Sequence, residues 1–210
     1  MKYCYAFRRF SDYPYLGNAF DMDPERITSK FLGRVKDMGF DGIELGIECL
    51  EKINGGEKGI KEFAKKLEDH GTPLLALRSG GLMIDPKYGE DNYKRIISSF
   101  KFAEFFNTKL INGAISIPEK SPYLDTGTEL ISSEWVAHAG LPFSQNSSRE
   151  TTLPEYELLA KKYSEVCDLA KEFDISISCE VHQNSPVDNS WSAKLIHKLV
   201  NKDNFGINPD

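Results

Sequence analysis

Residues 175–182 read ISISCEVH, and this stretch does most to decide how the chain folds. It has the length and composition of a buried β-strand, and helical patterns at 154–173 and 189–200 flank it. Side chains on a strand alternate between its two faces, so Glu180 and His182 share a face at the carboxyl end. Parallel α/β folds place their active sites at that end. The stretch therefore predicts both a parallel strand and a functional location.

The same alternation of short apolar runs and longer amphipathic stretches extends over the chain. Strands are predicted at 2–7, 41–46, 73–77, 109–112, 175–182 and 205–208, and helices at 24–38, 57–70, 90–106, 154–173 and 189–200. The connections are too long for hairpins, which implies parallel strands covered by helices. A doubly wound sheet and a (β/α)8 TIM barrel, which typically needs about 250 residues and eight units, both fit. No phosphate-binding glycine motif follows the first strand, so a nucleotide-binding sheet lacks its usual support.

The composition predicts one domain over residues 1–210, because no shift in composition marks a boundary. Residues 113–153 are rich in Ser, Pro, Gly and Thr and have little periodicity. Such a length is unusual for a simple connection, so we interpret it as a lid or loop insertion after the fourth strand.

Charge and cysteine usage exclude several classes of protein. The 26 Lys and Arg residues against 32 Asp and Glu give a net charge of −6, which disfavours nucleic acid as a partner. No apolar run is long enough for a membrane helix, and the first ten residues lack the apolar core of a signal peptide. The four scattered cysteines fit reduced thiols, so we expect a cytoplasmic protein.

Two carboxylates end consecutive predicted strands. Glu180 ends the strand at 175–182, and Asp210 follows Pro209 after the last strand. Carboxylates on neighbouring parallel strands repel each other unless one is protonated or a cation lies between them, which makes a divalent metal site a reasonable hypothesis. The alternatives are a structural ion pair at Glu180 and a frayed terminus at Asp210.

The order and spacing of several motifs resemble the xylose isomerase-like TIM-barrel superfamily of sugar phosphate isomerases and epimerases. They are DGIELG at 41–46, ING at 111–113, CEVHQNSPVDNSWSAKLI at 179–196 and NFGINPD at 204–210. The resemblance runs over essentially the whole chain, and it is most specific in the last third.

The resemblance implies a divalent ion held by a Glu after strand five, an Asp after strand six, a His after strand seven and a Glu after strand eight. Glu180 and Asp210 match the first two ligands, and the other two have no counterpart in these 210 residues. We therefore expect a barrel of about six βα units that is incomplete at its carboxyl terminus. We also expect this chain alone to bind metal weakly and to have negligible turnover.

The reaction that the resemblance implies is proton transfer next to a carbonyl, through an enediolate that the cation stabilises. Glu180 would be both metal ligand and acid/base catalyst, and His182 would contact substrate hydroxyls or orient Glu180. The substrate would be a sugar, sugar phosphate or polyol. Mn²⁺ or Mg²⁺ is the preferred ion, with Co²⁺ and Zn²⁺ as alternatives.

Three further residues are candidates for substrate binding. Glu44 ends the second strand, Arg78 follows the third and could hold a carboxylate or phosphate, and Asn112 ends the fourth. Structural interpretations compete with each: an ion pair for Glu44 and Arg78, and a turn cap for Asn112. Trp191 has the helical spacing of a core residue.

Two other function classes stay open. A non-catalytic binding or scaffold protein would use exposed edge strands to pair with another chain, for example as a homo-oligomer. An endonuclease IV-like nuclease would need histidines after strands two and three, where this sequence has Glu44-Leu45 and Arg78-Ser79. The nuclease is therefore the weaker of the two.

Overall fold

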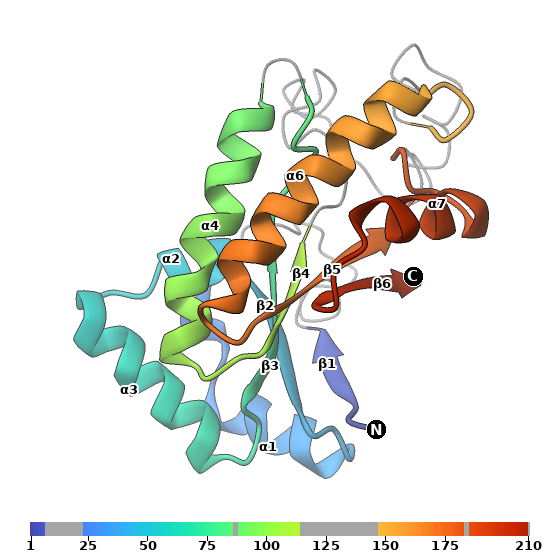
Figure 1. Cartoon of the computed structure of the whole chain (residues 1–210). Coiled ribbons are helices and arrows are strands. Elements are labelled where there is room, and N and C mark those ends of the chain that lie inside the picture. The colour runs from blue at the N-terminus through green and yellow to red at the C-terminus, as the bar shows by residue number, and fades with distance from the viewer. Residues whose placement is uncertain (7–22, 86–87, 114–146, 183–184, 210) are drawn as a thin grey trace, which may run out of the picture. The chain divides into compact units, whose positions relative to one another are not determined.

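The computed structural model describes residues 1–6, 23–85, 88–113, 147–182 and 185–209 (Figure 1). The strands of this described part are β1 (Cys4–Ala6), β2 (Gly42–Gly46), β3 (Leu74–Ser79), β4 (Leu110–Gly113), β5 (Ser176–Val181) and β6 (Phe205–Pro209). Its helices are η1 (Pro24–Arg26), α1 (Ser29–Asp37), α2 (Ile47–Glu51), α3 (Gly56–Asp69), α4 (Gly89–Phe105), α6 (Leu153–Lys171) and α7 (Ser190–Val200). The strand order follows the chain, β1-β2-β3-β4-β5-β6.

The predicted strands and helices are confirmed within a few residues, with two differences. The helix expected at 24–38 is interrupted, because the Thr28 hydroxyl accepts a hydrogen bond from the Phe31 N–H and starts α1 anew after η1. The short helix α2 was not predicted. The expected end of α1 is correct, since Gly39 has a φ of +87°, in the left-handed region that glycine adopts without strain.

Contacts divide the described chain into two compact units. The first comprises Met1–Arg78 and Ser99–Ile111, and the second comprises Ser79–Ser98 and Asn112–Asp210. The expected insertion at 113–153 lies mostly outside the described residues, which resume at Ser147 and enter α6 at Leu153.

The first unit pairs β1 with β2 and β2 with β3 in parallel. Tyr5 contacts Phe31 of α1 and Phe40 edge-on, with ring centroids 5.6 and 5.3 Å apart. This side of the strands therefore faces α1. Because successive side chains alternate, Glu44 lies on the opposite face, together with Arg78, whose register partner is Gly46.

The second unit pairs β5 with β6 in parallel, and Figure 1 shows the two strands side by side near the carboxyl terminus. Tyr163 of α6 is fully buried against Phe205, with ring centroids 5.0 Å apart, and its hydroxyl lies beside the Cys179 thiol. Cys179 and Phe205 thus face the helix layer. Alternation places Ser178 and Glu180 on the other face of β5.

The helix α7 begins where the sequence indicates, but it buries a different stripe. Asn189 caps it by accepting hydrogen bonds from the N–H groups of Trp191 and Ser192. The prediction that Trp191 is a core residue is wrong, since 60% of it is exposed. The buried residues are Ser192, Ala193, Ile196 and Val200. Small side chains at the start of this stripe let the helix pack closely, and they carry little hydrophobic signal in the sequence.

Within the described residues no helix combines the length and the apolar character that crossing a membrane requires.

Candidate functional site

Glu180 is the most unusual residue of the second unit. It lies one residue before the end of β5, and only 3% of its surface is exposed. Burying a carboxylate is costly unless polar partners compensate for the lost water. A buried acid at the carboxyl end of a parallel strand therefore needs donors or a cation nearby, and it marks the place where chemistry is expected.

Asn112 of β4 supplies one of these donors. Its side-chain Nδ2 donates to Oε2 of Glu180 at 3.1 Å, and only 5% of Asn112 is exposed. The structure thus brings together two residues that the sequence predicts for the site and that lie 68 positions apart. The alternative role for Asn112, capping the turn after its strand, does not account for this contact with a buried carboxylate.

Ser178 completes the cluster, and it was not among the residues predicted for the site. Its hydroxyl donates to Oδ1 of Asn112 at 3.0 Å, and 7% of the residue is exposed. A signal for it was present in the sequence. Ser178 stands two positions before Glu180 on the same predicted strand, so the period-two rule places both side chains on one face.

His182 lies just past the end of β5 and is half-buried. Its backbone N–H donates to the carbonyl of Val187 at 2.9 Å, which fixes the chain as it leaves the strand. Asp210 lies outside the described residues. The register of β5 and β6 pairs Glu180 with Asn208, two positions before Asp210.

Glu44 and Arg78 belong to the first unit, on the face of its strands that is turned away from α1. Both are half-buried. The Nη1 atom of Arg78 is buried and has no hydrogen-bond partner among the residues that the structure describes. Its Nη2 atom lies 3.4 Å from the position that a Cβ atom at residue 46 would occupy, which is about van der Waals distance, and the Glu48 carboxylate lies closer to that position.

A metal centre needs several ligands, and the described residues supply few at any one place. In the described ranges no group of three His, Cys, Asp or Glu side chains is close enough to hold an ion. Glu180 is a suitable oxygen ligand for Mg²⁺ or Mn²⁺, but within the described ranges it belongs to no such group of three. These residues alone therefore do not form a metal centre.

The thiol of Cys179, next to Glu180 in the chain, is not suited to metal binding or nucleophilic chemistry. Cys179 is fully buried, and burial is the main cause that raises its pKa to about 12, with the nearby Glu180 charge acting in the same direction. A thiol with this pKa stays protonated near neutrality, so it is a poor nucleophile and a poor metal ligand.

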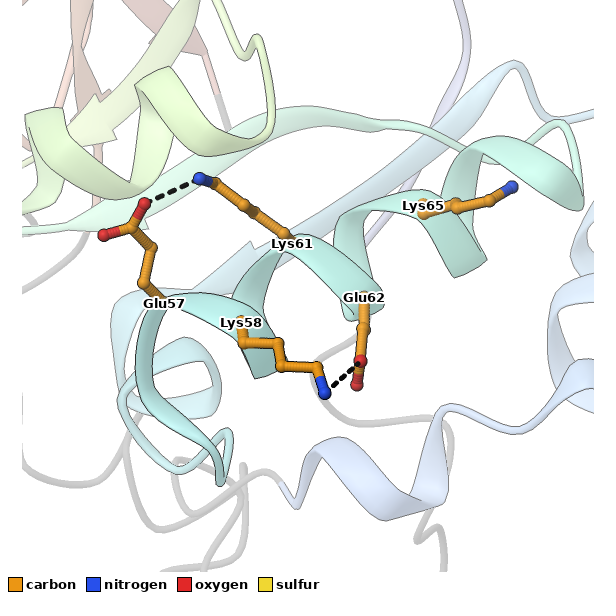
Figure 2. A pocket seen from close by; sticks show the side chains of 5 residues that line it. All are labelled: Glu57, Lys58, Lys61, Glu62 and Lys65. Carbon is orange, nitrogen blue, oxygen red and sulfur yellow. Dashed lines mark hydrogen bonds and ion pairs between the residues drawn. The ribbon is translucent and has the colours of Figure 1, made fainter.

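A hollow on the surface of the first unit is not a competing site. Figure 2 shows that all five side chains lining it, Glu57, Lys58, Lys61, Glu62 and Lys65, come from α3. Ion pairs one helical turn apart join Lys61 to Glu57 at 2.6 Å and Lys58 to Glu62 at 3.7 Å. These side chains are mostly exposed, as expected for the solvent face of an amphipathic helix.

Comparison with known proteins adds a family and a fold. A family model described as xylose isomerase-like TIM barrel matches residues 32–210. A search of curated proteins found no match. Among solved structures, a xylose isomerase-like TIM barrel protein from Mycobacterium smegmatis in complex with magnesium is 20% identical with a TM-score of 0.68, and the match covers 100% of this chain and 64% of that one.

Two further structures are similar to the same extent. The probable 3-DHS dehydratase AsbF from Bacillus anthracis is 16% identical with a TM-score of 0.67, over 100% of this chain and 63% of that one. D-psicose 3-epimerase from Clostridium cellulolyticum H10, solved with D-tagatose, is 16% identical with a TM-score of 0.65, over the same two shares. The chain thus spans less than two thirds of the length of these structures. The likenesses confirm the predicted fold, an incomplete (β/α)8 barrel to which the described residues contribute six strands, and they exclude the doubly wound sheet.

Proposed function

Because this chain belongs to the xylose isomerase-like TIM-barrel family, we propose that the protein is a sugar isomerase or epimerase that transfers a proton at the carbon next to a carbonyl. The observation that carries the proposal is the buried Glu180 carboxylate near the carboxyl end of β5, held by Asn112. Active sites of (β/α)8 barrels lie at this end of the strands. The similarity to D-psicose 3-epimerase solved with D-tagatose favours a ketose as substrate.

In this proposal Glu180 removes or returns the proton, because a carboxylate is a suitable acid/base group when its partners fix its position. Asn112 orients it through the 3.1 Å hydrogen bond, and His182 contacts a substrate hydroxyl or supports Glu180. Glu44 and Arg78 are proposed to contact the rest of the substrate.

A divalent ion, Mg²⁺ or Mn²⁺ in preference to Co²⁺ or Zn²⁺, would polarise the substrate carbonyl when bound. We propose Glu180 and Asp210 as its ligands. The magnesium in the similar Mycobacterium smegmatis structure supports a divalent ion. A cytoplasmic location is part of the same proposal, and the free thiols of Cys4, Cys49, Cys167 and Cys179 support it.

The test uses the protein encoded by the complete reading frame that contains these residues, alongside residues 1–210. Both are incubated with Mn²⁺ and a ketohexose in D₂O, and proton nuclear magnetic resonance follows deuterium uptake at the carbon next to the carbonyl. We expect uptake with the complete frame and a loss of about 10²- to 10⁴-fold in Glu180→Gln. Glu157→Gln, at an exposed position of α6, is the matched control and keeps full activity.

Absence of uptake with the complete frame, or equal rates in wild type and Glu180→Gln, would refute the proposed function. For residues 1–210 alone we expect negligible uptake and weak metal binding. A calorimetric titration that shows tight Mn²⁺ binding to this form would contradict that expectation.

A further inference from the structure

We propose that Ser178 and Asn112 are positioning residues for Glu180, a chain of two hydrogen bonds that we call the Ser178 relay. The Ser178 hydroxyl fixes the Asn112 amide, and the amide fixes the Glu180 carboxylate. This inference rests on the proposed function in one respect, namely that Glu180 acts on the substrate. Two contacts define the geometry of the relay, Ser178 Oγ to Asn112 Oδ1 at 3.0 Å and Asn112 Nδ2 to Glu180 Oε2 at 3.1 Å.

The direction of the Asn112 amide depends on its hydrogen-bond partners. Its oxygen and nitrogen ends are nearly equal in size, so packing alone does not select one orientation. The nitrogen end faces Glu180, where Oε2 accepts its hydrogen bond at 3.1 Å. The reverse orientation would bring two acceptor oxygens together at about 3 Å, which is repulsive.

Ser178 keeps the amide in this orientation. The Ser178 hydroxyl can donate to Oδ1, and with the amide reversed it would face an NH₂ group and could only accept. The observed arrangement gives each of the three groups a matching partner. In Ser178→Ala the amide keeps its contact with Glu180, but Oδ1 loses its donor and the orientation is less strongly fixed.

All three residues of the relay are buried. Exposure is 7% at Ser178, 5% at Asn112 and 3% at Glu180, so water does not readily replace a missing partner. Hydrogen bonds in such surroundings are stronger than in water, and consecutive bonds reinforce one another. A serine at position 178 also departs from the apolar side chain that fills a strand most simply. The polar residue is explained by the contact that it makes.

The experiment compares Ser178→Ala with Ser178→Thr, which keeps the hydroxyl, and with Ser176→Ala, an exposed position on the same strand. Side-chain amide signals of Asn112 are assigned in ¹⁵N-labelled protein by their loss in Asn112→Asp. We expect the hydrogen exchange of this amide to speed up about tenfold or more in Ser178→Ala and to stay near wild type in the other two serine variants. Thermal unfolding verifies that each variant is folded, and Ser178→Cys, nearly isosteric and a weaker donor, replaces the alanine variant if that one does not fold.

The second readout is kinetic and uses the complete reading frame. Loss of a residue that orients a catalytic group typically lowers activity by about 10- to 100-fold. We therefore expect kcat to fall by that factor in Ser178→Ala while KM stays within about twofold. Ser178→Thr restores kcat. Unchanged Asn112 amide exchange in Ser178→Ala overturns the relay, and so does a wild-type kcat despite faster exchange. Faster exchange in a protein that has no isomerase activity at all supports the relay and refutes only the proposed function.

Discussion

Replacing Gly81 by alanine tests how tightly the loop after β3 packs on α4. A Cβ atom built at residue 81 would lie 2.5 Å from Oδ1 and 2.6 Å from Cγ of Asn92, well inside van der Waals contact. Asn92 is 2% exposed, and its Nδ2 donates to the carbonyl of Leu82 at 2.9 Å. The methyl group cannot be accommodated unless the Asn92 side chain moves away from this carbonyl.

The cost has two parts. Leaving a buried amide or carbonyl without its hydrogen bond costs about 1–3 kcal/mol, and forcing a methyl group into a packed site costs a further 1–3 kcal/mol or so. The smaller entropy of the unfolded chain returns about 0.4–1 kcal/mol. We therefore expect Gly81→Ala to lower the free energy of unfolding by about 3 kcal/mol, a large fraction of the roughly 5–15 kcal/mol that holds a typical domain together.

Gly33→Ala is the matched control, because the same substitution there meets nothing. Gly33 lies within α1, and a Cβ atom built on it has no neighbour within 4 Å. Alanine favours a helix interior over glycine by about 0.8–1.0 kcal/mol, so this variant should be more stable than wild type.

Urea unfolding followed by circular dichroism measures both variants. With a slope of about 2 kcal/mol per molar urea, the midpoint should fall by about 1.5 M in Gly81→Ala and rise slightly in Gly33→Ala. If Gly81→Ala unfolds within about 0.3 M of wild type, the loop does not depend on the close approach of Asn92, and the packing argument is wrong.

Four further predictions concern stability and accessibility. Burial raises the pKa of Cys49, Cys167 and Cys179 to about 12 from an ordinary value of 9.0, so in the folded protein at pH 8 a thiol reagent should leave all three unmodified and label them only in denaturant. Because these raised pKa values favour the protonated thiol, the contribution of the thiols to the free energy of unfolding is full below about pH 9 and declines toward pH 12. This decline should be smaller in Cys179→Ala than in wild type. An equal decline would argue against the buried thiol as its cause. Asn189→Ala removes the acceptor for two N–H groups of α7 and should lower the free energy of unfolding by about 1–2 kcal/mol, as measured by thermal unfolding. Asn201→Ala lies past the end of the helix and leaves this cap intact, so it tests the left-handed backbone at residue 201, whose φ is +48°. In a double-mutant cycle Lys202 and Asp168, paired at 2.6 Å with 25% and 57% of their side chains exposed, should couple by at most about 1 kcal/mol and less at high salt; a salt-independent coupling of several kcal/mol would contradict this.

The sequence predicted most of the fold because its signals are local. Gly39 adopts a left-handed conformation just past the predicted helix end at 38, and Asn189, the first residue of the predicted helix 189–200, caps α7. The break at Thr28 was missed, since Pro24 and the residues after it also suit an uninterrupted helix. The start of a new helix there depends on one hydrogen bond from Phe31 to the Thr28 hydroxyl, which no periodicity reveals.

The features of the candidate site that depend on one strand were predictable from the sequence. The contact between residues of two different strands was not. Glu180 follows from its place at a strand end, and its face follows from alternation. The contact with Asn112 depends on the register between distant segments, so the sequence placed Asn112 in the site without its partner. The prediction that Trp191 faces the core was wrong for a related reason. The helix packs through Ser192 and Ala193, and the effect of their small size depends on the neighbour that they contact.

The contacts on either side of residues 114–146 have a consequence for how this protein could diversify. Before the segment, Asn112 is held by Ser178 and Glu180; after it, the backbone N–H of Ser148 donates to Asp188 at 3.2 Å and its hydroxyl accepts from Asn189 at 2.7 Å. Each of these contacts is made to Ser178, Glu180, Asp188 or Asn189, which belong to β5 or follow it closely in the chain. One short stretch of sequence therefore anchors the chain both at Asn112 and at Ser148. Substitutions at these four residues would disturb an anchor directly, so we expect the protein to diversify at other positions.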